Sequence, residues 1–145
     1  MIEPCGYQYV YFLLRSDHLP AREMAAQLGM EPDESSVKGS KRESPPVPAV
    51  HSWRVVCRDS GLTVDEQVDR ILDRLEPIAD RIAALVRVID ESEGEGLTST
   101  LQVVRYLNDE DGDQHQRLGW HLDRRALEFL HQTGAELDVD EYGDD

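Results

Sequence analysis

The sequence has few of the cysteines that crosslink small domains, and it lacks the long apolar runs that anchor chains in membranes. It has two cysteines, Cys5 and Cys57, in 145 residues, which is too few for a disulfide framework and gives no metal-ligand spacing. No apolar run is long enough to cross a bilayer, and the start of the chain lacks the basic region of a signal peptide. We therefore expect reduced thiols, no membrane association and a cytoplasmic protein.

Motifs for catalysis and metal binding are also missing. The sequence has no Walker, Rossmann or G-x-S-x-G pattern, and its histidines form neither H-x-H nor H-E-x-x-H. The acidic run 108–113 is not an EF-hand loop, because Leu107 and Leu118 would occupy the first and last ligand positions. These absences predict a protein without cofactor or metal, and they favour a non-enzymatic role.

Cations are scarce as well. Thirty acids against fifteen bases give a net charge of −15 at pH 7, of which residues 61–145 carry −14 and residues 1–60 carry −1. Such a field repels nucleic acids and anionic membranes, whereas it suits either simple solubility or a basic protein partner. The one local basic cluster, Lys38, Lys41 and Arg42, lies in a proline-rich segment, 31–50, that lacks apolar periodicity. Long loops of this kind inside compact domains are usually functional or disordered.

The rest of the chain alternates between strand and helix patterns. Both faces of the first strand pattern are apolar near its middle, which predicts a strand that is covered on both sides or lies centrally. A T-x-x-E capping box and an apolar stripe predict one long helix, which Pro77 should kink or split after Leu75 or Glu76. The expected strands are 7–14, 51–58, 100–107, 118–122 and 135–139, and the expected helices lie within 16–30, 63–86 and 123–134.

This order, β-α-(loop)-β-α-β-β-α-β, predicts a single α+β domain over residues 1–145. We expect a ferredoxin-like arrangement, with a mixed or mainly antiparallel sheet of about five strands and helices on one face. The order of the strands within the sheet and the oligomeric state stay open at this point.

The candidate binding residues lie in and just after the loop 31–50. Lys38, Arg42, His51 and Trp53 would line a pocket between this loop and the sheet, where a basic loop on an acidic body suits an anionic group or an acidic patch of a partner. Two alternatives remain: the loop folds back on the protein's own carboxylates, and Trp53, like Trp120, is an anchor of the core.

The succession of these segments resembles a known family. The pieces that carry the resemblance are YVYFLLRS, a helix ending in LGMEP, the pair Lys38-Gly39, a strand with Trp53, the helix DEQVDRILDRLEPIADRIAAL, and TGAELDVDEYG with Asp140 and Tyr142. Together they resemble the bacterial DUF4279 family, whose function is unknown and which is similar in outline to small immunity proteins of toxin systems.

The resemblance implies a non-enzymatic binding module with a basic protein partner, such as a toxin. The alternative is a small-molecule-binding protein or an enzyme that uses a pocket beside the loop 31–50.

Overall fold

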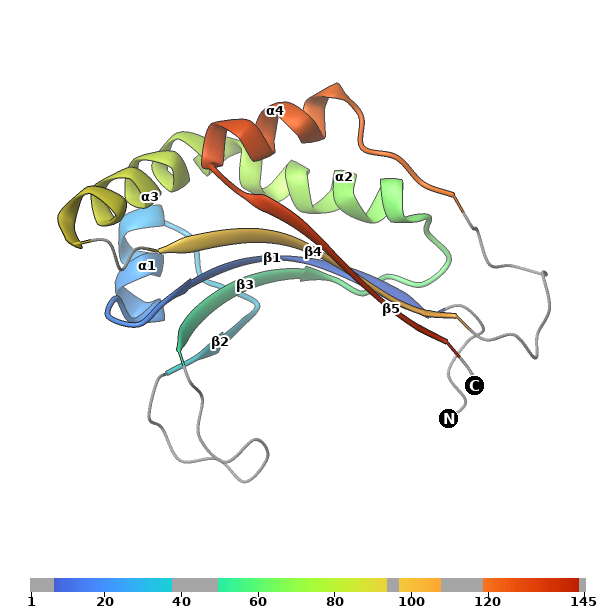
Figure 1. The fold of residues 1–145 in the computed structure, drawn as a ribbon, viewed down its shortest axis with the longest axis horizontal. Coiled ribbons are helices and arrows are strands. Elements are labelled where there is room, and N and C mark those ends of the chain that lie inside the picture. Colours follow the sequence, from blue (N-terminus) through green and yellow to red (C-terminus); the bar gives the residue numbers. More distant parts are fainter. Residues whose placement is uncertain (1–6, 38–49, 94–96, 108–118, 144–145) are drawn as a thin grey trace.

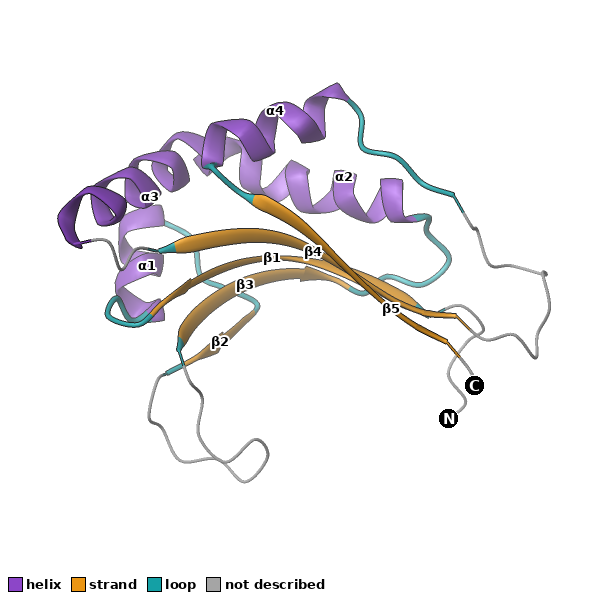
Figure 2. Cartoon of the chain, in the orientation of Figure 1, coloured by secondary structure: helices purple, strands orange, loops and turns teal. Residues whose placement is uncertain are grey.

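The computed structural model describes residues 7–37, 50–93, 97–107 and 119–143 (Figure 1). Helices cover one face of a five-stranded mixed sheet, as Figure 2 shows, which confirms the predicted α+β class. The strands are β1 Gln8–Ser16, β2 Glu34–Ser36, β3 His51–Cys57, β4 Thr98–Leu107 and β5 Glu136–Gly143. The helices are α1 Ala21–Leu28, α2 Val64–Leu75, the short 3₁₀ helix η1 Glu76–Ile78, α3 Ala79–Glu93 and α4 Arg124–Thr133.

The sheet has the strand order β2-β3-β1-β4-β5, which places β1 at its centre. Three of the four neighbouring pairs are antiparallel, and only β4 and β5 are parallel. Helix α4 connects these two adjacent strands, as a crossover between parallel strands requires. The order therefore differs in detail from a ferredoxin-like sheet, in which each crossover joins strands separated by a third.

Two expected segments need correction. Residues 119–122 do not form the predicted strand: the backbone N–H of His121 donates to the Asp65 carboxylate of α2 at 3.1 Å, and Trp120 and Leu122 are half-buried against the core. Their alternation reflects packing against helices. Conversely, β2 lies within the expected loop 31–50 and pairs with β3.

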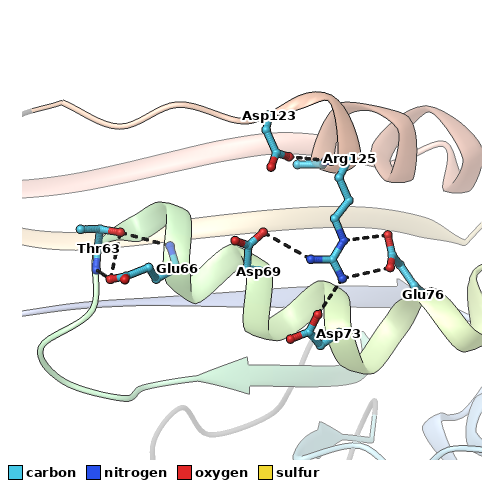
Figure 3. Close-up of polar contacts among 8 residues, drawn as sticks. Thr63, Glu66, Asp69, Asp73, Glu76, Asp123 and Arg125 are labelled. Carbon is cyan, nitrogen blue, oxygen red and sulfur yellow. Dashed lines mark hydrogen bonds and ion pairs between the residues drawn. The ribbon is translucent and has the colours of Figure 1, made fainter.

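The predicted helix starts at Thr63 and Asp123 and the interruption at Pro77 are confirmed, whereas α3 continues to Glu93, past the predicted end at residue 86. Thr63 caps α2 in the predicted box: its hydroxyl accepts from the Glu66 N–H at 3.2 Å, and the Glu66 carboxylate accepts from the Thr63 N–H at 2.8 Å (Figure 3). Helix α2 ends at Leu75, where Pro77 enters the 3₁₀ turn, and α3 follows. Left-handed Gly134, with φ of 69°, ends α4.

Arg125 joins the last helix to α2. Its guanidinium contacts the carboxylates of Asp69, Asp73 and Glu76, which lie along one face of α2 and η1, at 2.8 to 3.4 Å (Figure 3). The hydrogen bond from Arg125 lowers the pKa of Glu76 below its usual value. One cation thus offsets part of the repulsion among the three carboxylates along α2 and η1.

The core lies between the sheet and the helices. Trp53 on β3, Phe12 on β1 and Leu72 on α2 are all fully buried there, and the Phe12 ring meets Phe129 of α4 edge-on. None of the helices in the described part of the chain is long and apolar enough to cross a membrane.

Candidate functional site

The candidate site is the sheet face turned away from the helices. Figure 1 shows a bowed sheet with the helices on one side, while no described helix covers the opposite side, which we call the open face. Side chains alternate between these faces along each strand. On β1, Val10, Phe12 and Leu14 point towards the helices and are fully buried, so Tyr9 and Tyr11 point to the open face.

All five tyrosines of the chain form one continuous row, the tyrosine ladder. Neighbouring strands bring them together, because Tyr106 lies beside Tyr142 in the β4–β5 register and its N–H donates to the Tyr7 carbonyl. The ring centroids are separated by 6.0 Å (Tyr11–Tyr9), 5.7 Å (Tyr9–Tyr7), 5.9 Å (Tyr7–Tyr106) and 5.0 Å (Tyr106–Tyr142). Such spacings are typical of favourable aromatic pairs.

Two arginines of the β3 side lie over one end of the ladder. The guanidinium carbons of Arg54 and Arg58 are each 4.5 Å from a ring centroid, that of Tyr11 and that of Tyr9 respectively. Both arginines also pair with Glu34 of β2, Arg58 at 3.0 Å and Arg54 at 3.7 Å. At this end, therefore, the protein supplies its own cations to the rings, and the Glu34 carboxylate partly neutralises these cations.

The other end of the ladder is bordered by acids. Glu136, Asp138 and Asp140 alternate along β5 on the open face, in register with residues of β4 that face the same way. Tyr106 and Tyr142, which lie beside this edge, are the most exposed rings of the chain that the structure describes, at 43% and 50%. The open face thus changes from arginine-rich to acidic between β3 and β5.

The phenols of Tyr9 and Tyr11 stay protonated at neutral pH. Burial raises the pKa of Tyr9, and the neighbouring Tyr106 raises it further. Burial also raises the pKa of Tyr11 against the opposing effect of Arg54. A protonated phenol donates and accepts hydrogen bonds and stacks, but it is no base at pH 7.

Other reactive groups do not form a centre in the described ranges. Histidine, cysteine and carboxylate side chains there make no group of three or more that could hold a metal ion. Cys57 is a buried free thiol, and burial raises its pKa, so little thiolate forms near neutral pH. Cys5 and the acidic run 108–113 lie outside the described residues.

The comparison with protein families agrees with the arrangement of the segments. A family model described as a domain of unknown function, DUF4279, matches residues 6–144. The chain belongs to the DUF4279 family. The family domain therefore includes the helix layer and the whole open face, which confirms the resemblance in the sequence. Searches of curated proteins and of solved structures give no match.

Of the four binding residues predicted from the sequence of this DUF4279 domain, the structure describes two, His51 and Trp53. His51 borders a cavity of about 500 Å³ between α1 and residues 31–37. Trp53 contributes no surface to that cavity: its side chain is fully buried, and its indole N–H donates to the Met30 carbonyl at 3.1 Å. Its alternative interpretation, a core anchor, is the correct one. Lys38 and Arg42 lie outside the described residues.

Sequence reasoning missed the tyrosine ladder, although one signal was available. Tyr7, Tyr9 and Tyr11 recur at every second position and alternate with the apolar row of β1. Two apolar faces suggested a strand that is covered on both sides or lies centrally. β1 is central, but described helices cover only one of its faces, and tyrosines are well suited to the other because a phenol combines apolar surface with a polar tip.

Proposed function

We propose that this DUF4279 protein is a non-enzymatic binding module that recognises a basic protein partner through its open face, as an immunity protein recognises a toxin. The observation that carries the proposal is the tyrosine ladder, whose rings line a sheet face that no described helix covers, beside an acidic strand. Tyrosine and arginine are enriched in protein interfaces and among the residues that dominate their binding energy.

The charges favour a cationic partner. Arg54 and Arg58 already form cation–π contacts with the rings of Tyr11 and Tyr9. Tyr106 and Tyr142 offer equivalent rings next to the carboxylates of β5, so lysines or arginines of a partner would find both stacking and ion pairing there. The net charge of −15 steers such a partner towards the protein at low ionic strength. The buried free thiol of Cys57 suits the cytoplasm, where we place this activity.

The test begins with capture at low salt of partners from cells that make the protein, followed by titration of each purified partner. Replacing both exposed rings, Tyr106→Ser with Tyr142→Ser, should weaken binding at least about tenfold, as expected for hot-spot aromatics. Leu127→Ser is the matched control, because Leu127 is equally exposed, at 54%, but lies on α4. A partner without net positive charge, or one bound equally by the double variant, would contradict the proposal.

A second candidate function rests on the cavity beside His51. It is lined by Arg22 of α1, Glu31 and His51, among others, and the side chains of Arg22 and His51 suit a small carboxylate or phosphate although Glu31 carries a like charge. Here the protein would be a small-molecule-binding protein or an enzyme with its pocket beside the loop 31–50. The test is a thermal-shift screen with small anions: a ligand should raise Tm for the wild type and not for His51→Ala. A screen with no stabilising anion would exclude this candidate.

A further inference from the structure

Strand β5 forms one edge of the sheet. It pairs with β4 on one side, and no described element pairs with its other side. With eight residues it is a long edge, whereas β2 at the opposite edge has three. An edge strand carries a row of backbone N–H and C=O groups that can pair with a further strand.

The side chains of β5 form two distinct rows. The row on the open face consists of Glu136, Asp138, Asp140 and Tyr142, and the row on the opposite face consists of Leu137, Val139 and Glu141, which pairs with Arg105. These two apolar side chains are 40% and 36% exposed, although the apolar residues of β1 on the same side of the sheet are fully buried. Beyond its backbone edge, β5 thus offers an acidic row on one face and an incompletely covered apolar row on the other.

We infer that β5 binds an extended segment of a partner protein, in which cationic and apolar side chains alternate, as a sixth strand of the sheet. The added strand would place its cations beside the acidic row and its apolar side chains beside Leu137 and Val139, while main-chain hydrogen bonds supply affinity. The inference rests on the proposed function, since it specifies which part of a basic partner is bound.

The charges argue against a second copy of this chain as the occupant. If two β5 strands paired antiparallel across a twofold axis, the acidic rows would lie opposite each other on the same face. Like charges directly opposite in a sheet are destabilising. Each chain also carries a net charge of −15, which opposes self-association.

The decisive experiment uses a synthetic peptide of alternating lysine and valine, eight residues long like β5, with both ends blocked. Binding to the intact protein is measured by fluorescence anisotropy for three forms: unmodified, N-methylated at every lysine, and N-methylated at every valine. Alternate residues of a strand direct their N–H groups to opposite edges, so only one methylated set blocks the edge facing β5. One methylated peptide should lose at least about tenfold in affinity, because several ladder hydrogen bonds are lost together. Equal affinity of all three peptides would overturn the inference.

Charge variants locate the site. Asp138→Asn with Asp140→Asn should weaken binding of the unmodified peptide about fivefold, as expected for exposed ion pairs. Glu23→Gln with Glu128→Gln removes the same net charge from exposed positions on α1 and α4 and should leave the affinity within about twofold. Equal losses in both double variants would overturn the inference, as would a dimer in light scattering that the peptide dissociates.

The two proposals fail in different ways. If the N-methylated peptides bind equally well but the variant Tyr106→Ser with Tyr142→Ser still loses its protein partner, the edge inference is wrong and the proposed function stands. If the peptide binds as inferred but the tyrosine variant retains every partner, the tyrosine ladder is not the recognition surface.

Discussion

Truncation of Trp53 tests the central packing of the fold. Trp53 lies on β3 beneath the helices, is fully buried, and donates its indole N–H to the Met30 carbonyl just beyond α1. Trp53→Ala removes the largest fully buried side chain that the structure describes. Substitutions of this kind lower the free energy of unfolding by about 3–5 kcal/mol. That is a large part of the stability of a domain of this size.

Trp53→Phe separates the hydrogen bond from the volume. Phenylalanine keeps most of the apolar ring but leaves the Met30 carbonyl without its donor, which costs about 1–3 kcal/mol for a buried group. We therefore expect Trp53→Phe to destabilise the fold by about 2 kcal/mol, less than Trp53→Ala. Trp120→Phe is the control, because Trp120 is only half-buried.

The assay is urea unfolding followed by far-UV circular dichroism, which does not depend on the tryptophan that is removed. The midpoint should fall while the slope m stays constant, because the surface exposed on unfolding changes little. If Trp53→Ala lowered the free energy of unfolding by less than about 1 kcal/mol, as surface substitutions do, then Trp53 would not be an anchor of the core.

Three further perturbations test local features by the same unfolding assay. Thr63→Ala removes the cap of α2 and should cost about 1 kcal/mol; no loss would mean that the capping box is not formed in solution. Arg125→Met should also cost about 1 kcal/mol, with a smaller loss at high salt, since the residue is partly exposed; a loss independent of salt would refute an electrostatic role. Asp33→Asn tests pH dependence: Arg74 holds the pKa of Asp33 below its usual value, so the carboxylate stabilises the fold at pH 7 and this contribution disappears as pH falls through the lowered pKa. The free energy of unfolding of the wild type should exceed that of Asp33→Asn by about 1 kcal/mol at pH 7, and this difference should shrink as pH falls below about 4. A difference that persists in acid would contradict this account.

Local signals in the sequence were sufficient for most helix boundaries, although not for the end of α3 at Glu93. The hydroxyl of Thr63, the ring of Pro77 and the flexibility of Gly134 act on backbone groups within a few residues, so their effects can be read without knowing the fold. The segment 119–122 misled for a related reason. Its apolar alternation is real, but its backbone bonds to Asp65 of α2, a partner far away in the sequence.

The candidate site depends on such distant pairings. Tyr106 meets Tyr7 and Tyr142 only because β4 lies between β1 and β5. The sequence left two roles for Trp53, a binding residue or an anchor of the core, and its complete burial beneath the helices identifies it as the anchor. Because the function of the DUF4279 family is unknown, the function proposed for this protein rests on the chemistry of the open face.

The sequence by itself determined the α+β class, the helix caps, the break at Pro77 and the acidic character of the chain, because these follow from composition and short-range contacts. The tertiary structure alone decided the strand order, and with it the tyrosine ladder, the face of β1 that the described helices leave open and the position of β5 at the sheet edge. Pairing between strands joins residues far apart in the chain, and no local pattern specifies which strands become neighbours.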